Sequence, residues 1–252
     1  MTESKKLEII NSFREQRISL RKHAGSQRYT NAPCLLKRLT MDDFDNVRKL
    51  HNEIVETTSR ELFIPTDNDD LTAILSGDGI GLGVECDGEL ICLRLLMFEN
   101  HVPLSEETLS FSTWGQERSC FMETCVVHRD FRGNNLQFLT YFHIESILWG
   151  YFDSIYSTVS PFNIFSLRNI LQCGFYACEL KECYGGYMRL LLRKGIKNRF
   201  VIDTHSYERA KITDYAKQQA LLAQHQVGYR MNHNSKGTWM LYAPAYPIQS
   251  DE

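Results

Sequence analysis

The chain has 252 residues, of which 43% are hydrophobic and 23% are charged, and its formal net charge at pH 7 is −3. This composition is typical of a soluble globular protein with one large domain, or with one domain and a smaller appendage. The slightly acidic balance argues against nucleic acid as a partner, which needs a basic surface. There is no apolar run of about eighteen residues, so the sequence predicts neither a membrane span nor a membrane partner.

The cysteines and the N-terminus both indicate a cytoplasmic protein. The N-terminal stretch MTESKKLEIINSFREQRISLRKH has charges throughout and no apolar core, so it does not resemble a signal peptide. The eight cysteines form no CxxC pair and have no matching histidine spacing, and several lie in apolar segments. We therefore expect buried free thiols in a reducing compartment, and no bound metal.

The first third of the chain predicts helices around a short strand. Residues 1–31 are expected to form one amphipathic helix that ends in a polar stretch, because apolar residues recur at helical spacing. A short strand follows at 35–40. Thr40 then caps a helix over 40–56 with an acidic first turn, and a second helix is expected at 67–79.

The middle of the chain alternates between strands and helices. Asp87-Gly88 predicts a tight hairpin between two strands, and a nearly continuous apolar run at 118–127 predicts a central strand covered on both faces. A helix buried against the sheet is expected at 134–149. The further elements are strands at 80–86, 89–99, 153–159, 175–182 and 187–194 and a helix at 162–173. This order predicts an α/β fold with a mixed sheet, in which the strand–helix–strand unit from 121 to 159 is parallel and right-handed.

After Lys194 the character of the sequence changes. A strand at 199–205, a helix at 213–226 and a strand at 237–244 are expected there. We therefore divide the chain into an N-terminal helical extension, 1–34, a main domain, 35–195, and a C-terminal extension, 196–252, packed on the main domain. The C-terminal extension is expected to cover a substrate site or to form a homodimer.

Residues 126–137 read VVHRDFRGNNLQ and join the central strand to the buried helix. Gly133 lets the backbone approach an anion closely, Arg132 adds positive charge, and the first turn of the helix presents free amides. These features favour a phosphate site at the end of a strand of an α/β sheet. A plain helix cap with a turn glycine explains the stretch equally well on its own.

A second motif separates these interpretations. Residues 127–136 resemble the V-x-P-x-[YF]-R-G-x-G-[LI] motif of the GNAT superfamily of acyl-CoA-dependent N-acetyltransferases. As in that family, Asn163 is followed eleven residues later by Gly174-Phe175, and YGG at 184–186 precedes a strand. The resemblance covers roughly residues 35–194 and implies a GNAT-like mixed, mostly antiparallel sheet, with a central parallel splayed strand pair and flanking helices.

The resemblance also implies a reaction and a set of residues. It implies an N-acetyltransferase that uses acetyl-CoA as co-substrate and acts on a primary amine, of a small molecule or an exposed amino group, by direct attack. Cys125, Val126 and Val127 would line the pantetheine arm and the acetyl group, and Asn163 would hydrogen-bond the coenzyme with Ser166 nearby. The pyrophosphate cradle would consist of Arg132, Gly133, Asn134, Asn135, Leu136, Gln137 and Phe138.

Three positions depart from the family pattern. Arg129 replaces the usual proline, which a turn tolerates. Asn135 replaces the second glycine, and asparagine accepts unusual backbone angles better than most residues. Gln137 replaces a small residue, which would crowd the phosphate.

The proton chemistry is the less complete part of the resemblance. Ile170 stands where the family often has a tyrosine acid, and Thr158 stands where some members have a carboxylate base. Glu123, within FMETCVV, is the remaining candidate base, because burial would raise its pKa. The alternatives for Glu123 are a salt bridge to an arginine or an outward-facing edge position. Cys125 and Cys173 are interpreted as core residues rather than nucleophiles.

The acceptor site would lie opposite the coenzyme, next to the helices at 42–76. Glu53, Glu56 and Glu61 would give it an acidic rim suited to a cationic amine, although such residues also form ordinary solvated helix faces. Two other functions stay open. The missing groups at Ile170 and Thr158 favour a non-catalytic acyl-CoA-binding or sensor protein, and the fold could also serve only as an interaction module.

Overall fold

The computed structural model describes residues 1–23, 29–99, 118–197 and 200–247. The chain forms two compact units. The first unit comprises Met1–Arg60, Pro65–Glu99 and Phe121–Tyr151, and the second comprises Glu61–Ile64, Asn100–Cys120 and Phe152–Glu252. Among the described helices, none has the length and apolar character needed to cross a membrane.

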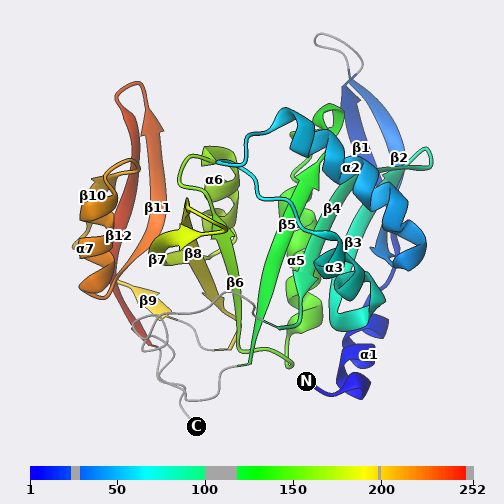
Figure 1. Ribbon diagram of the computed structural model, residues 1–252, viewed down its shortest axis with the longest axis horizontal. Coiled ribbons are helices and arrows are strands. Elements are labelled where there is room, and N and C mark those ends of the chain that lie inside the picture. Colours follow the sequence, from blue (N-terminus) through cyan, green and yellow to red (C-terminus); the bar gives the residue numbers. More distant parts are fainter. Residues whose placement is uncertain (24–28, 100–117, 198–199, 248–252) are drawn as a thin grey trace. The chain divides into compact units, whose positions relative to one another are not determined.

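The first unit is an antiparallel sheet with helices on both faces. Its strands are β1 Gln16–His23, β2 Tyr29–Leu39, β3 Gly79–Cys86, β4 Glu89–Met97 and β5 Ser119–Val127, in the order β1-β2-β3-β4-β5. Its helices are α1 Glu3–Ser12, α2 Phe44–Thr57, α3 Asn68–Ala73 and α5 Leu136–Leu148, with short turns η1 Met41–Asp43, η2 Ile74–Asp78 and η3 Arg129–Phe131. Helices α2 and α3 cover one face and α5 the other, so β4 is buried on both (Figure 1).

The predicted helix over 1–31, and with it the helical extension over 1–34, is wrong beyond residue 12. Helix α1 ends at Ser12 and buries Ile9 and Ile10, while Leu7, which the helical pattern placed on the apolar face, is 56% exposed. Residues 16–23 form β1, which pairs with β2 along its whole length. The alternating apolar residues of this segment fit a strand, and pairing with β2 satisfies its backbone groups. Residues 24–28 of the predicted helix lie outside the described residues.

Local signals at element ends are confirmed. Thr40 caps the turn that leads into α2, as expected, and forms a capping box with Asp43. Asp87 and Gly88 have φ of 52° and 79°, as a tight two-residue hairpin between β3 and β4 requires. The central strand and the buried helix expected at 118–127 and 134–149 are β5 and α5.

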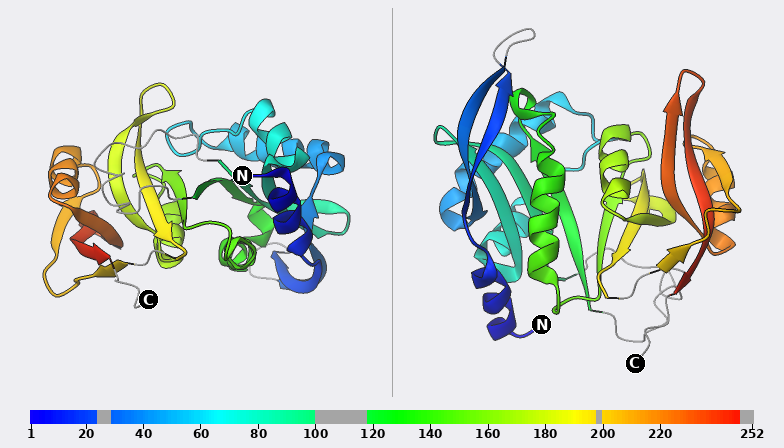
Figure 2. Two further views of the ribbon diagram at one scale, coloured as in Figure 1. Left: turned by 90° about the horizontal axis from the view of Figure 1, so that it is seen from below. Right: turned by 180° about the vertical axis from the view of Figure 1, so that it is seen from behind.

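In its described residues, the second unit is a further antiparallel sheet with two helices. Its strands are β6 Ser154–Val159, β7 Tyr176–Cys183, β8 Tyr187–Gly195, β9 Phe200–Ile202, β10 Glu208–Lys211, β11 Gln226–Asn234 and β12 Gly237–Pro247. They follow the order β6-β8-β7-β11-β12-β10, with β9 paired to β12. Helix α6 Ile164–Gln172 contacts β11, and α7 Tyr215–Ala223 contacts β7 and β11 (Figure 2).

The C-terminal residues continue this sheet. The expected strand, helix and strand after residue 194 are β9, α7 and β12, although Arg199 of the first lies outside the described residues. Strands β10 and β11 were missed, because their polar sequences show little apolar alternation. Gly228 of β11 pairs with Ala177 of β7, and a Cβ at Gly228 would lie 3.1 Å from the Ala177 Cβ. Glycine therefore permits the close approach through which residues after 196 join the second unit.

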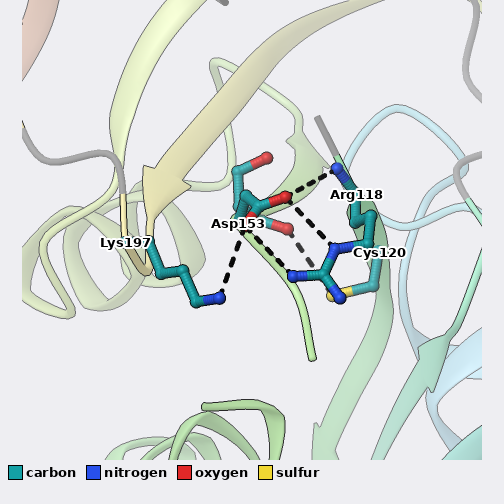
Figure 3. A network of polar contacts seen from close by, with 5 residues as sticks. Arg118, Cys120, Asp153 and Lys197 are labelled. Atoms are coloured by element: carbon teal, nitrogen blue, oxygen red, sulfur yellow. Dashed lines mark hydrogen bonds and ion pairs between the residues drawn. The ribbon is translucent and has the colours of Figure 1, made fainter. Parts of the chain in front are cut away.

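A polar network fixes the start of β6 in the second unit (Figure 3). The Asp153 carboxylate accepts a hydrogen bond from the Arg118 backbone at 2.9 Å and lies 3.4 Å from the Arg118 Nε. Lys197, just after β8, approaches the same carboxylate at 3.9 Å, and the Cys120 thiol donates to the Ser154 carbonyl. Asp153 thus ties three segments of this unit together.

The predicted fold class is confirmed, because both units consist of mostly antiparallel sheet flanked by helices. The strands expected to form the central parallel pair are β5 and β6, which begin or end the strand order of their units. The boundaries at residues 34 and 195 stay a prediction.

Candidate functional site

Strand β5 carries an irregularity at the residue that the sequence singles out as a base. Leu95 of β4 pairs with Thr124, whereas Leu96 pairs with Met122, so Glu123 is an extra residue on β5. Such a bulge re-aims a side chain and is frequent beside active sites. Met122 and Thr124 on either side are buried, while Glu123 is partly exposed.

The environment of Glu123 suits a base at neutral pH. Burial, followed by the negative charges of Asp70 and Asp67, raises the pKa of Glu123 to about 7. Within the described chain Glu123 has no ion-pair partner, so the salt bridge considered from the sequence is not observed there. A carboxylate with a pKa near the working pH is the group that general base catalysis favours.

A buried chain of hydrogen bonds holds the segment that contains Asp67 and Asp70 against β5, the strand of Glu123. The His51 Nε2 accepts a bond from the Thr66 backbone N–H at 3.2 Å, and the Thr66 and Thr124 hydroxyls lie 3.1 Å apart. This chain joins α2, the start of α3 and β5. Burial and Arg48 lower the pKa of His51 to about 4, so the ring is neutral and accepts at Nε2. Sequence reasoning missed this network because its members are far apart in the chain.

The turn between β5 and α5 has an open backbone. Gly133 has φ of 81°, and Asn135 has φ of 56° and ψ of 26°, so asparagine adopts the left-handed conformation in place of the family's glycine. The N–H groups of Gly133, Asn134, Asn135 and Leu136 find no acceptor in the part of the chain that the structure describes. Consecutive free N–H groups at a helix start form an anion-binding arrangement.

Strand β1 is fastened to this turn. The Asn134 side chain accepts a hydrogen bond from the Arg21 N–H at 2.9 Å and donates to the Arg21 carbonyl at 2.7 Å and the Phe131 carbonyl at 2.9 Å. The Arg21 guanidinium donates to the Gly133 carbonyl at 3.3 Å. The side chain of Asn134 is therefore occupied in holding β1, and only its backbone N–H is available to a ligand.

Three cations border the turn. Arg21 and Lys22 come from β1, with the Lys22 ammonium 5.7 Å from the centre of the Phe131 ring, and exposed Arg132 belongs to the turn itself. Of these only Arg132 was identified from the sequence. Arg21 and Lys22 were missed because residues 1–31 were expected to be helical.

A fourth cation lies beneath the first turn of α5. Arg94 of β4 is 6% exposed and donates to the Thr140 hydroxyl at 2.9 Å and to the Gln137 carbonyl at 2.7 Å. A third N–H points to the Met122 sulfur. Arg94 has no carboxylate partner within ion-pair distance among the described residues. The buried charge adds to the positive potential of the helix start.

The predicted coenzyme residues divide between the units. Cys125, Val126, Val127 and the turn through Phe138 lie together in the first unit, with Val126 buried and its two neighbours partly exposed. Asn163 and Ser166 lie in the second unit, where Asn163 caps α6. Its Oδ1 accepts from the Ser166 N–H at 3.1 Å and its Nδ2 donates to the Leu62 carbonyl at 3.2 Å.

Ile170 and Thr158 stand at two positions where members of the family that the sequence resembles have proton-transferring groups. Ile170 lies in α6 and can neither give nor take a proton. The Thr158 hydroxyl lies 2.8 Å from the Tyr184 hydroxyl, which belongs to the turn between β7 and β8. Neither position carries a base.

The three glutamates of the expected acidic rim have different surroundings. Glu61 lies 3.9 Å from the buried Arg189 in the second unit. Glu53 and Glu56 lie on α2 in the first unit, where Glu53 lines a cavity of about 400 Å³ between α2, the β3–β4 hairpin and η3. None of the predicted coenzyme residues lines that cavity.

Comparison with known proteins identifies the fold. No family model matches the sequence, and no curated protein matches it. A crystal structure of Arabidopsis thaliana NAA60 in complex with acetyl-CoA aligns with 14% identity and a TM-score of 0.50, over 65% of this chain and 98% of that one. The GNAT domain of S. lividans PAT aligns with 12% identity and a TM-score of 0.48, over 71% and 96%. An N-acetyltransferase from Staphylococcus aureus Mu50 aligns with 15% identity and a TM-score of 0.48, over 65% and 97%. The chain has the GNAT fold.

Proposed function

We propose that this chain is an N-acetyltransferase that transfers an acetyl group from acetyl-CoA to a primary amine, of a small molecule or an exposed amino group, by direct attack. The observation that carries the proposal is the open turn between β5 and α5, with its free N–H groups and bordering cations. It follows directly on a strand whose carboxylate has a pKa near 7. The Arabidopsis protein with this fold has been crystallised with acetyl-CoA.

The chemistry of the turn fits the phosphates of coenzyme A. The N–H groups of residues 133–136 would donate to the pyrophosphate oxygens, and Arg21, Lys22 and Arg132 would balance their charge. Gly133 leaves the approach open, because a Cβ there would meet no atom within 4 Å. Cys125, Val126 and Val127 would then lie along the pantetheine arm and acetyl group.

The reaction would need a proton acceptor for the ammonium group, and we assign that role to Glu123. Glu123 would take a proton from the ammonium group, and the free amine would attack the thioester carbonyl. As the C–S bond breaks, the departing thiolate of coenzyme A would take up the proton that the nitrogen loses when the amide forms. A pKa of about 7 leaves a large fraction of Glu123 deprotonated at neutral pH while it still holds a proton well.

The same environment favours a cationic acceptor. Asp67 and Asp70 are close enough to raise the pKa of Glu123, so an approaching ammonium group would be attracted by three carboxylates. These residues, rather than the expected rim of Glu53, Glu56 and Glu61, are the acidic residues beside the base. From the sequence, Asp67 and Asp70 were placed only within the helix expected at 67–79.

We also propose a cytoplasmic compartment for this chain. All eight cysteines are free thiols, which agrees with a reducing, cytoplasmic compartment. A homodimer through residues after 196 stays a prediction.

A coenzyme-release screen tests the proposed function. The chain is incubated with acetyl-CoA and a panel of amines, amino acids, polyamines and aminoglycosides, and free thiol is measured. We expect amine-dependent release with at least one cationic acceptor. Release that is equal with and without amine across the panel would count against the acetyltransferase.

A non-catalytic acyl-CoA-binding or sensor protein is the second candidate, and Ile170 and Thr158 are the observations that favour it. A thermal shift with acetyl-CoA, without release for any amine, would select it, because a ligand stabilises the fold to which it binds. The absence of both would select an interaction module.

A further inference from the structure

Two cysteines lie side by side on the strands that lead to the open turn. Cys125 of β5 is opposite Arg94 of β4, and Cys92 of β4 is opposite Val127. Opposed residues share a face of the sheet, so Cys92, Arg94 and Cys125 are on one face and the two cysteines are diagonal neighbours. Each thiol influences the pKa of the other.

The charge around Cys125 favours its thiolate. Arg94 is buried, and the groups to which it donates are neutral: a hydroxyl, a carbonyl and a thioether. The neighbouring Cys92 thiol, and after it the charge of Arg94, lower the pKa of Cys125 to about 6 against the opposing effect of burial. The Cys125 thiol and burial raise the pKa of Cys92. One thiol of the pair is therefore ionised at neutral pH, and the other is its proton-bearing neighbour.

Access to solvent selects the same residue. Cys125 is partly exposed, whereas Cys92 is 0% exposed. The residue with the lower thiol pKa is therefore also the more exposed of the two. A low thiol pKa, partial exposure and an adjacent second thiol are together the properties of cysteines that oxidise selectively.

A second thiol pair in the same unit provides a matched comparison. Cys34 of β2 is directly opposite Cys86 of β3, which is closer to the geometry of a disulfide than a diagonal pair. Both residues are buried, and burial, followed by the hydrogen bond to Cys86, raises the pKa of Cys34 to about 12. Geometry thus favours oxidation of Cys34–Cys86, and thiolate character favours Cys92–Cys125.

We propose that Cys125 is a site of oxidative modification, at which a hydroperoxide oxidises the thiolate and Cys92 resolves the product as an intrachain disulfide. In the first step the Cys125 sulfur attacks the O–O bond and gains a hydroxyl group. The remaining oxygen leaves as alkoxide or hydroxide, which takes a proton from water. In the second step the Cys92 sulfur bonds to the Cys125 sulfur, and the hydroxyl leaves with the Cys92 proton as water. The two electrons that the sulfurs lose reduce the peroxide.

The modification has a consequence that rests on the proposed function. Cys125 is one of the residues that we place along the acetyl group, so an added oxygen or a link to β4 would obstruct that position. We therefore expect oxidised protein to lose acetyl transfer, and a dithiol reductant to restore it.

Peptide mapping of the full chain tests the modification. Reduced protein is exposed to hydrogen peroxide, quenched with an alkylating agent at intervals, and analysed by mass spectrometry. We expect the link between Cys92 and Cys125 to form before any link between Cys34 and Cys86. In Cys92→Ala, Cys125 should accumulate as a sulfenic acid that dimedone captures, and in Cys125→Ala, Cys92 should stay reduced. Cys173→Ala, which removes a buried cysteine elsewhere, should leave the rate of linkage unchanged.

Two results would overturn the proposal. One is a Cys34–Cys86 link that appears first, and the other is a Cys125 that remains as alkylatable after peroxide as before it. Circular dichroism of each variant shows whether it has folded. Failure of the proposed function would appear instead as an absence of amine-dependent coenzyme release from the reduced protein, which the thiol mapping does not depend on.

Discussion

Two strand-to-helix junctions of this chain have the same order of elements and treat their backbone N–H groups in opposite ways. Between β5 and α5, Asn135 is left-handed, makes no side-chain cap, and the N–H groups of residues 133–136 have no acceptor in the described chain. Between β6 and α6, the Asn163 side chain accepts from the Ser166 N–H, and the Ser160 hydroxyl accepts from the Phe162 N–H at 3.2 Å.

The difference shows how a helix start becomes available to a ligand. A capping side chain satisfies the first-turn donors and stabilises the helix, but it also occupies the place that an anion would take. At the first junction Asn135 occupies the N-cap position without a side-chain cap, and the side chain of its neighbour Asn134 holds β1. That contact also brings Arg21 to the turn. We infer that the first junction lacks a side-chain cap and that its free N–H groups form a phosphate site instead.

The largest effect is predicted for Glu123, the proposed base, which belongs to neither junction. Glu123→Gln should lower acetyl transfer by roughly 10²- to 10⁴-fold, the usual contribution of a general base, without weakening acetyl-CoA binding. For the unaltered chain, the rate should rise with pH and level off above about 7, because Glu123 must be deprotonated. Steady-state kinetics across pH measure both. Glu182→Gln, at an exposed residue of β7, is the matched control. A variant that retains full activity would remove Glu123 from the mechanism.

The same substitution predicts a change in stability with a definite sign. The folded chain raises the pKa of Glu123 from 4.5 to about 7, so folding favours the protonated form. The contribution of Glu123 to the free energy of unfolding therefore falls as pH rises through this window, and above it a buried carboxylate destabilises the fold. Glu123→Gln should be more stable than the unaltered chain above pH 7, by on the order of 1–3 kcal/mol. The difference should disappear near pH 4, where the carboxyl is mostly protonated in both states. Denaturant titration measures it.

The next effect is on the backbone of the open junction. Asn135→Val should weaken acetyl-CoA binding by roughly tenfold, because a left-handed conformation costs a β-branched residue about 1–2 kcal/mol or more. Asn135→Gly should keep the affinity. His225→Val, at a residue with φ of 60° between α7 and β11, should lower the melting temperature and leave the affinity unchanged. If isothermal titration calorimetry finds the same acetyl-CoA affinity for all three variants, the backbone of the open junction does not determine coenzyme binding.

The cations of the open junction should have smaller effects. Arg21→Gln and Lys22→Gln should each weaken acetyl-CoA binding by roughly two- to fivefold, as expected for exposed charge pairs. The loss should shrink as salt is added, because salt screens such pairs. Arg17→Gln, an exposed change on the same strand, is the control. If all three changes weaken acetyl-CoA binding equally, the affinity depends on the net charge of the chain and not on the position of these cations.

The smallest effect concerns the closed junction. Asn163→Ala should lower the free energy of unfolding by about 1 kcal/mol, the usual value of an N-cap, and leave acetyl-CoA affinity nearly unchanged, because both ends of the amide already have partners. Asn163→Asp should retain the cap. If Asn163→Ala weakens acetyl-CoA binding more than Asn135→Val does, the coenzyme role that the family resemblance implies for Asn163 gains support and our comparison fails.

The sequence predicted those features that depend on neighbouring residues. The Thr40 cap, the Asp87-Gly88 turn, the strand before the open turn and the helix after it all follow from local pattern. The position of Glu123 within an apolar run correctly suggested a raised pKa. Its bulge could not be predicted, because it depends on the register between β4 and β5.

What the sequence missed depends on long-range pairing. Strand β1 gains its stability from β2, and Arg21 meets Asn134 across 113 positions of the chain. No periodicity within residues 16–23 reveals that contact. Strands β10 and β11 were missed for a related reason, since their polar segments are strands only because β12 pairs with both.

We propose that the open turn between β5 and α5 binds the phosphates of coenzyme A. Backbone amide NMR of the isotope-labelled chain, titrated with coenzyme A, tests it most directly. We predict that the amide resonances of Gly133, Asn134, Asn135 and Leu136 are among those that shift most, since their N–H groups would acquire acceptors. If these four resonances stay in place at saturating coenzyme A, the open turn is not the phosphate site and the account is wrong.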